Sequence, residues 1–215
     1  MRYAQLFAVL ALGWCLSACQ SSALSEQDNK APAPQETQKS EQPSAQEKPK
    51  GDFAYVKMEI KDKGAIIIEL NLKEAPKTSE NFLKLVREGF YDGIRFHRVV
   101  PKFVAQAGDP QSKTMDLDDP RMGTGGPGYT IKFEPNSLKH KRGAIGMART
   151  LDPDSAGSQF YICLEDLPQL DGNYVIFGRV VEGMDVVDRI VMGDTILKAE
   201  ILKEWKPKSE GGQSP

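Results

Sequence analysis

The residues best suited to chemistry lie in the short segment 96–109, which reads FHRVVPKFVAQAGD. This segment contains a cation in Arg98, an amide in Gln106 and two apolar side chains in Phe103 and Val104. An arginine side chain stays charged and presents a planar fork of N–H donors. Such a set can hold a bound group and stabilise an electron pair on it without a nucleophile. We therefore expect non-covalent chemistry, with no metal site and no cofactor.

A glycine-rich segment resembles a nucleotide-binding loop only superficially. Residues 123–128 (GTGGPG) match the pattern G-x-G-x-x-G, which binds dinucleotides when it joins a strand to a helix. Here an aspartate-rich loop, 111–122, precedes the glycines and a strand-like run, 129–133, follows them. We expect these glycines to curve the backbone along the rim of a groove. The aspartates of 111–122 lack the spacing of a calcium loop and are expected to be solvated.

Histidine, serine and cysteine offer no convincing nucleophile or base. Neighbours in a strand face opposite sides, so His97 is expected to point away from the side that carries Arg98. His140 lies between two lysines and is expected to be a solvated loop residue. Ser158 lacks the G-x-S-x-G elbow of a serine nucleophile. Cys163 lies in an apolar run and is expected to be a buried, inert thiol.

Further segments continue the pattern of 96–109 in a fixed order. They are 123–129 (GTGGPGY), 143–149 (GAIGMAR) and 157–162 (GSQFYI), followed by LDG at 170–172 and FG at 177–178. Together they closely resemble the signature segments of the cyclophilins, the peptidyl-prolyl cis/trans isomerases, over about residues 53–203. The resemblance implies a mainly β fold, a closed eight-stranded antiparallel β-barrel capped by two α-helices. It also implies a substrate groove outside the barrel, because side chains fill the interior.

The resemblance assigns the chemistry to Arg98. Rotation about an X-Pro bond breaks amide resonance, at a barrier of roughly 18–20 kcal/mol. Half-way through the rotation, the prolyl nitrogen has a free electron pair, and a donor aimed at it binds the transition state better than the ground state. An acceleration of about 10⁵ requires roughly 7 kcal/mol. One charge-assisted hydrogen bond supplies part of this, and a pocket that orients the proline supplies the rest.

Other side chains are assigned to the groove by the same resemblance. Gln106 matches the amide that binds a substrate carbonyl and positions the arginine. The residues that match the lining of the proline pocket are Phe103, Val104, Tyr161 and Leu170. Val104 stands where methionine is commoner and Tyr161 where phenylalanine is commoner, but both can seat a proline ring. The backbone of Ala148 and Arg149 is expected to pair with an extended substrate, although asparagine is frequent in place of Arg149.

Two departures from the family pattern concern an inhibitor. Gln169 stands where cyclosporin-sensitive members have tryptophan. Tyr174, which is also assigned to substrate binding, stands where many eukaryotic members have histidine. We expect isomerase activity to be retained and cyclosporin binding to be weak, because a flat indole edge is lost.

Short strands must position these residues, since the apolar runs are separated by Gly, Pro or Asp turns. Residues 53–60 and 65–70 predict a hairpin. Residues 75–86 predict a helix with Pro76 in its first turn, Gly89 after its end, and an apolar face made of Phe82, Leu85 and Val86. Further strands are predicted at 95–100, 103–107, 129–133, 144–148, 159–163, 175–181 and 196–202, with a second helix at 184–191. About eight strands with two helices favour a closed antiparallel sheet. The pattern alone leaves a barrel and a sandwich open.

The composition fits one domain with polar extensions. The 215 residues carry a net charge of −2 and a pI near 5.8, which gives no sign of nucleic-acid binding. Residues 53–205 are expected to form the isomerase domain and 206–215 a polar tail. Proline-containing polypeptides are the expected partners, and a monomer is the expected state.

The N-terminal residues are expected to export the domain. An apolar run at 6–16 follows Arg2 and is too short to span a bilayer. Residues 16–19 (LSAC) look like a bacterial lipobox, so 1–18 are predicted to be a signal peptide and Cys19 the lipidation site. A simple secretory signal with an incidental cysteine is the alternative.

A polar stretch then separates the lipid from the domain. Residues 19–52 hold almost no large apolar side chains and predict a disordered tether. The protein is therefore expected to be exported and anchored by lipid to a bacterial membrane. Gln20 favours the outer membrane, on its periplasmic side, if the source is Gram-negative.

Three functions are compatible with these features. The leading one is an isomerase that acts on exported unfolded or flexible chains. The others are a module that binds proline peptides with little turnover, and a general folding chaperone. Arg98 favours the enzyme, because it is lost in many inactive relatives of the family.

Overall fold

The computed structural model describes residues 51–206. The predicted signal peptide, Cys19, the tether up to residue 50 and the tail from residue 207 lie outside the described residues. Within 51–206, no helix is long and apolar enough to cross a lipid bilayer.

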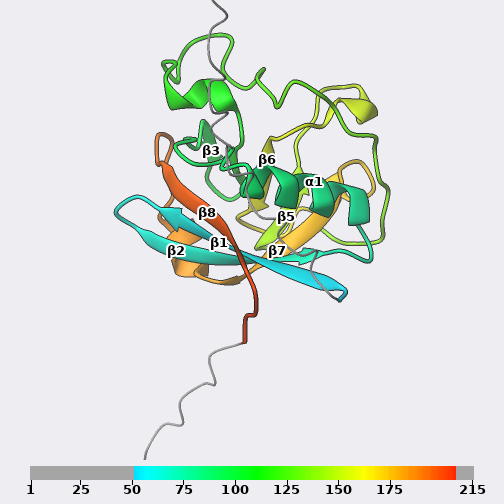
Figure 1. Cartoon of the computed structure of the whole chain (residues 1–215). Coiled ribbons are helices and arrows are strands. Elements are labelled where there is room, and N and C mark those ends of the chain that lie inside the picture. The colour runs from blue at the N-terminus through cyan, green and yellow to red at the C-terminus, as the bar shows by residue number, and fades with distance from the viewer. Residues whose placement is uncertain (1–50, 207–215) are drawn as a thin grey trace, which may run out of the picture. The chain divides into compact units, whose positions relative to one another are not determined.

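One antiparallel sheet forms the body of the domain, in the order β3-β4-β6-β5-β7-β2-β1-β8 (Figure 1). Its strands are β1 (Phe53–Ile60), β2 (Gly64–Asn71), β3 (Arg98–Val100), β4 (Val104–Ala107), β5 (Ala144–Met147), β6 (Phe160–Cys163), β7 (Ile176–Glu182) and β8 (Ile196–Leu202). The α-helices are α1 (Pro76–Arg87) and α2 (Met184–Asp188), and the 3-10 turns are η1 (Pro110–Lys113), η2 (Pro153–Ser155) and η3 (Pro168–Leu170).

The sheet curls until its two edges approach each other. In the described part of the chain, the edge strands β3 and β8 share no ladder, but segments 93–96 and 193–196 are joined by backbone hydrogen bonds. The amide of Phe96 donates to the carbonyl of Asp194, and the amide of Ile196 donates to the carbonyl of Ile94, each at 2.8 Å. The predicted mainly β fold with eight antiparallel strands and two helices is confirmed. The predicted closure of the barrel holds only approximately.

Alternating apolar residues explain why the long strands bury one face. In β1, Ala54, Val56, Met58 and Ile60 are buried, while the residues between them are half-buried. Side chains in a strand point alternately to the two sides, so this pattern directs one row into the core. The same alternation later separates the core from the candidate site.

Helix α1 packs its apolar side against the sheet. Pro76 occupies its first turn, and Phe82, Leu85 and Val86 are buried as predicted. The Phe82 ring contacts the ring of Phe160 edge-on, with centroids 5.4 Å apart. Helix α1 packs against β8, β2 and β7, and α2 packs against β2.

Three predicted elements differ in the structure by more than one residue. The strand predicted at 95–100 begins only at Arg98, and Arg95 forms an isolated bridge with Thr195. Residues 129–133 are not a strand, because only one isolated bridge, Ile131 with Ala156, forms there against an irregular loop. Helix α2 ends at Asp188 rather than at residue 191. The amide of Val191 donates to the side chain of Asp194 at 2.7 Å, so it leaves the helical hydrogen-bond pattern.

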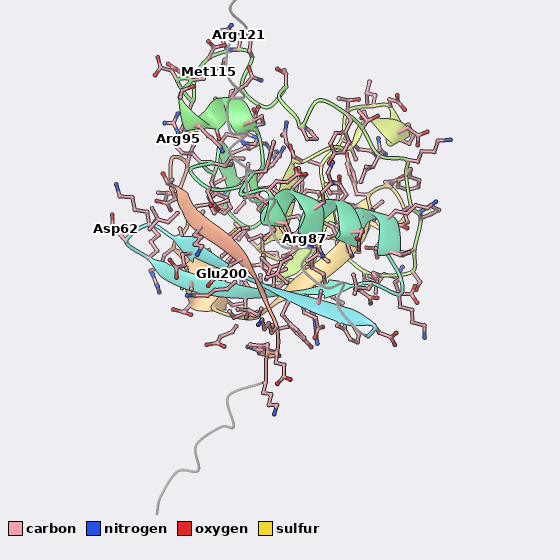
Figure 2. The ribbon with its side chains drawn as sticks, in the orientation of Figure 1. Asp62, Arg87, Arg95, Met115, Arg121 and Glu200 are labelled. Carbon is pink, nitrogen blue, oxygen red and sulfur yellow. The ribbon has the colours of Figure 1, made fainter. Side chains whose placement is uncertain are left out.

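The aspartate-rich loop 111–122 is attached to the domain by Arg95 (Figure 2). The Arg95 amide donates to the hydroxyl of Ser112 at 3.0 Å, and its guanidinium donates to the carbonyls of Ser112 and Met115. Further along, Arg121 donates to the Asp119 carboxylate at 2.8 Å, and these hydrogen bonds lower the pKa of Asp119 to about 2. The loop is therefore joined to the domain at its start, and residues further along it alternate between half-buried and exposed.

Candidate functional site

A row of side chains crosses four strands on the outer face of the sheet. Arg98 of β3 lies opposite Gln106 of β4, Gln106 lies opposite Tyr161 of β6, and Tyr161 lies opposite Gly146 of β5. Directly opposed residues share one face of a sheet. The structure therefore places both predicted catalytic residues and a predicted pocket residue side by side.

The alternation of the strands separates this face from the core. Residues at the intervening positions belong to the main core, namely Ala105, Ala107, Ile145, Met147, Phe160 and Ile162. The opposite face carries a second, smaller set of buried residues: Val104, Ala144, Tyr161, Cys163, Leu167 and Ile176. We call this set, with the half-buried side chains packed on it, the outer apolar cluster.

The outer apolar cluster brings the predicted pocket together. Val104 and Tyr161 are buried in it, and the half-buried side chains packed against it include Phe103, Ala148, Leu170 and Tyr174. The Tyr174 ring meets the Tyr161 ring edge-on, with centroids 6.1 Å apart. Gln169 is exposed beside Leu170 in η3.

Arg98 lies at the edge of this cluster with its donors available. Its side chain is exposed, and its guanidinium carbon lies 5.6 Å from the centre of the Phe103 ring. Within residues 51–206, Arg98 has no ion pair with a carboxylate. A ligand seated on the apolar cluster could therefore receive its hydrogen bonds.

Gln106 is oriented by a residue that the sequence did not single out. Its Nε2 donates to Oε1 of Gln159 at 3.1 Å, and Nε2 of Gln159 donates to the carbonyls of Gly123 and Gly125, each at 2.8 Å. Gln106 makes no hydrogen bond to Arg98 in the described structure, although the two are opposed across β3 and β4. Gln159 lies inside the GSQFYI motif, which was its only sequence signal.

The glycine segment is held by a buried carboxylate. Asp109 accepts hydrogen bonds from the amides of Gln111 (2.8 Å), Gly123 (2.7 Å) and Gly125 (3.1 Å). A Cβ on Gly125 would lie 2.1 Å from Oδ1 of Asp109, so only glycine fits there. The segment lines a hollow of about 300 Å³ together with Gln106 and residues 148–150. The glycine segment therefore lies beside Gln106, where the sequence predicted the rim of a groove.

His140 is not the solvated loop residue that the sequence predicted. Its side chain is fully buried, its Nδ1 lies 2.9 Å from Oδ1 of Asp171, and its Nε2 lies 2.9 Å from the hydroxyl of Tyr161. Hydrogen bonds from the backbone and ring of His140 lower the pKa of Asp171 to about 2. Burial raises the pKa of Tyr161 well above its usual value. Nothing in the Lys-His-Lys run predicted this, because both partners lie far away in sequence.

The remaining side chains with reactive groups are structural. His97 is buried while Arg98 is exposed, in line with the predicted opposite orientations, and burial lowers the pKa of His97. Burial raises the pKa of Cys163 to about 12, so it is an inert thiol, as expected. Ser158 is buried and donates to the carbonyl of Gly108 at 2.7 Å.

Arg149 uses its side chain to hold the loop that follows β5. Its guanidinium donates to the carbonyls of Thr150 (2.8 Å) and Asn173 (2.7 Å), and it lies 4.7 Å from the centre of the Tyr174 ring. The backbone of Ala148 and Arg149 therefore has a fixed position beside the outer apolar cluster.

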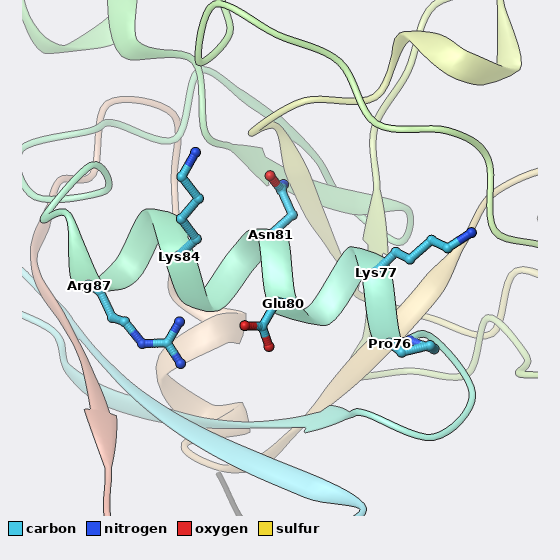
Figure 3. A pocket seen from close by; sticks show the side chains of 6 residues that line it. All are labelled: Pro76, Lys77, Glu80, Asn81, Lys84 and Arg87. Atoms are coloured by element: carbon cyan, nitrogen blue, oxygen red, sulfur yellow. The ribbon is translucent and has the colours of Figure 1, made fainter. Parts of the chain in front are cut away.

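A larger hollow lies elsewhere. It measures about 530 Å³ and is lined by residues of α1 alone: Pro76, Lys77, Glu80, Asn81, Lys84 and Arg87 (Figure 3). None of these is a predicted site residue, and all six lie on one helix at the surface of the domain. We therefore place the candidate site on the outer face of β3, β4, β6 and β5.

Known proteins resemble this chain in sequence and in structure. The family model of the cyclophilin type peptidyl-prolyl cis-trans isomerases matches residues 55–206. A peptidyl-prolyl cis-trans isomerase of Helicobacter pylori is 48% identical over 139 residues, which cover 63% of this chain and 79% of the relative. Peptidyl-prolyl cis-trans isomerase B of Bacillus subtilis is 42% identical over 144 residues, which cover 66% of this chain and 94% of the relative.

A solved structure has the same fold. The crystal structure of a cyclophilin type peptidyl-prolyl cis-trans isomerase of Cryptosporidium parvum matches with a TM-score of 0.63 and 29% identity, over 71% of this chain and 99% of that one. The same protein was also solved in the presence of the dipeptide Ala-Pro. With its curled eight-stranded sheet and matching motifs, the chain belongs to the family of cyclophilin type peptidyl-prolyl cis-trans isomerases.

Proposed function

We propose that this protein accelerates the rotation of X-Pro bonds in exported unfolded or flexible chains, by non-covalent stabilisation of the twisted amide. The supporting observation is the exposed Arg98 guanidinium, which has no ion pair among the described residues and lies beside the outer apolar cluster. The proline ring binds on Phe103, Val104, Tyr161 and Leu170. The guanidinium then donates to the electron pair that appears on the prolyl nitrogen.

Each part of the site has a share in this step. The outer apolar cluster removes water from around the proline, which strengthens the hydrogen bond from Arg98. Gln106, held by Gln159, offers its carbonyl and amide groups to the substrate backbone. Ala148 and Arg149 present backbone groups to the extended peptide beside the cluster. No covalent bond forms, so no proton or leaving group needs to be moved.

Removal of the guanidinium tests the proposal. Loss of one preorganised donor typically lowers the rate by about 10²–10³. We expect Arg98→Ala to lower kcat/KM by roughly this factor in an NMR exchange assay on an Ala-Pro peptide. Arg179→Ala is a matched control, because Arg179 is also an exposed strand arginine but pairs with Glu69 at 2.9 Å. Equal rates in wild type and Arg98→Ala would instead indicate a binding module or a chaperone with little turnover.

Weak binding of cyclosporin is proposed on the basis of Gln169. A glutamine there offers no flat aromatic edge, and it is exposed beside Leu170. We expect Gln169→Trp to bind cyclosporin more tightly than wild type, as measured by inhibition of the isomerase assay. Nanomolar inhibition of the wild type would contradict the proposal.

The proposed location is the bacterial envelope. Cys19 would carry diacylglycerol after removal of 1–18, and acyl chains contribute roughly 0.8 kcal/mol per buried CH₂ to membrane binding. Metabolic labelling with a fatty-acid analogue, in wild type and Cys19→Ser, tests this. Label that persists in Cys19→Ser, or a mature N-terminus other than Cys19, would contradict it.

A further inference from the structure

A chain of hydrogen bonds, buried at its centre, ends on Tyr161 of the candidate proline pocket. It runs from the Asp171 carboxylate through the His140 imidazole to the hydroxyl of Tyr161, with both ring contacts at 2.9 Å. The His140 side chain is fully buried and Tyr161 is 5% exposed. Water therefore has little access to the bond between His140 and Tyr161, whereas the Asp171 side chain is 20% exposed and also lies 3.4 Å from Nζ of Lys139.

The direction of the hydrogen bonds follows from their chemistry. Asp171 has a pKa of about 2, so at neutral pH its carboxylate only accepts, and Nδ1 of His140 carries a hydrogen. In a neutral imidazole, Nε2 then accepts. In that neutral form, the Tyr161 hydroxyl donates to Nε2. Because Tyr161 replaces the phenylalanine that is commoner in the family, this last bond depends on a departure from the family pattern.

His140 is itself fixed at both of its backbone groups. Its amide donates to Oδ1 of Asp171 at 2.9 Å, and its carbonyl accepts from the amide of Leu167 at 2.7 Å. Leu167 and Asp171 flank η3, which carries Leu170. The imidazole is thus attached to one wall of the pocket and reaches across to Tyr161 on β6.

The Tyr161 ring is closely packed, since the residue is only 5% exposed and the His140 ring stacks beside it with centroids 6.1 Å apart. On one side it lies over Gly146, where a Cβ would be 2.3 Å from its Cζ atom. On another side it meets the edge of the Tyr174 ring. These contacts enclose the ring, and the hydrogen bond at its far end fixes the hydroxyl relative to His140 and so opposes a tilt of the ring. The ring shares its row with Gln106, so a tilt would move the proline relative to Arg98.

We propose that Asp171 and His140 are positioning residues, which act through the Tyr161 hydroxyl to set the distance between the two walls of the proline pocket. One wall is the Tyr161 ring on β6, and the other is Leu170 in η3. Neither Asp171 nor His140 touches the substrate. The inference rests on the proposed function, since it assumes that proline binds on the outer apolar cluster.

The first test removes only the hydroxyl. In the full-length protein, Tyr161→Phe should raise KM for an Ala-Pro peptide roughly three- to tenfold, about the effect of one neutral hydrogen bond, and leave kcat within about twofold. Arg98→Ala should instead lower kcat. An unchanged or lower KM in Tyr161→Phe would overturn the proposal. Thermal unfolding confirms that each variant is folded at the assay temperature.

The second test asks whether His140 acts through that hydroxyl. A glutamine can place its amide near the Nε2 position and accept from Tyr161, whereas an asparagine reaches only the Nδ1 position. We expect His140→Gln to keep KM closer to wild type than His140→Asn does. In the Tyr161→Phe background, His140→Asn should raise KM no further. Additive effects of the two substitutions would overturn the proposal.

A spectroscopic measurement is independent of turnover. The ¹⁵N resonances of His140 should show hydrogen on Nδ1, and the Nε2 resonance should shift in Tyr161→Phe. Hydrogen on Nε2 in the wild type, or no shift in the variant, would overturn the assignment. If the wild type has no isomerase activity, the proposed function fails, while the dissociation constant for an Ala-Pro peptide still tests the role of His140.

Discussion

The buried Asp109 carboxylate allows a prediction with a worked magnitude. Its Oδ2 accepts from Gly123 and Gly125, and its Oδ1 accepts from Gln111. In Asp109→Asn, one of these oxygens becomes an NH₂ group of the same size. The better orientation keeps the carbonyl toward the two glycines and turns the NH₂ group against the Gln111 amide, so two donors then face each other.

The free-energy cost has two parts. An unsatisfied buried N–H costs about 1–3 kcal/mol, and the change from a charged to a neutral acceptor weakens each of the two remaining bonds by about 1 kcal/mol. We therefore expect Asp109→Asn to lower the free energy of unfolding by about 3–5 kcal/mol. For a domain of this size, that corresponds to a fall in Tm of roughly 6–20 °C.

The same substitution should also lower the isomerase activity, because Asp109 is linked to the candidate site. The glycine segment holds Gln159 through the carbonyls of Gly123 and Gly125, and Gln159 orients Gln106. At a temperature where the variant is folded, we expect kcat/KM to fall by about tenfold, which corresponds to about 1.4 kcal/mol. Loss of orientation in the Gln106 side chain is the physical reason.

Urea unfolding and the NMR exchange assay provide the two measurements. Asp62→Asn is the control, because Asp62 lies in the β1–β2 turn with a φ of 58°, a conformation that asparagine adopts readily (Figure 2). We expect its stability and activity to match wild type. If the free energy of unfolding of Asp109→Asn lies within about 0.5 kcal/mol of the wild-type value, the hydrogen bonds to the glycine segment stabilise the protein less than we infer.

Three further predictions concern single residues. Gly146→Ala adds a Cβ 2.3 Å from Cζ of Tyr161. We expect the free energy of unfolding, measured in urea, to fall by about 1–3 kcal/mol, and calorimetry to show weaker binding of an Ala-Pro peptide. Binding with wild-type affinity would contradict this. Burial lowers the pKa of His97 below its usual 6.5, so the unfolded chain takes up the proton more readily and stability falls as the pH drops through 6.5. His97→Gln should therefore show a smaller fall in Tm between about pH 7.5 and 5.5 than wild type, whereas parallel curves would refute the assignment. The pKa of Cys163 is about 12, so little of its thiol is ionised near neutral pH. We therefore expect a thiol reagent at about pH 8 to modify Cys163 at least about 100-fold more slowly in the folded than in the unfolded protein. Mass spectrometry measures the two rates. Rapid labelling of the folded protein would show that the thiol is accessible.

Much of the fold could be predicted because its signals are local. Pro76 and the apolar spacing of Phe82, Leu85 and Val86 predicted α1, since a helix repeats every 3.6 residues. The strand at 196–202 was predicted at its observed bounds. The run 129–133 failed as a strand because strand formation also needs a regular partner, and the loop containing Ala156 is not one.

The sequence alone determined which residues alternate within each predicted strand, because residues two apart in a strand point the same way. The resemblance of its motifs to the cyclophilin signature assigned Arg98, Gln106 and Tyr161 to one groove. Only the tertiary structure decided their partners. Three sets of hydrogen bonds join residues that lie 14 to 53 positions apart in the sequence. They link Gln159 to Gln106, Asp109 to the glycine segment, and His140 to both Asp171 and Tyr161. Such contacts depend on strand register and loop packing, which arise from the whole chain and leave no local pattern to read.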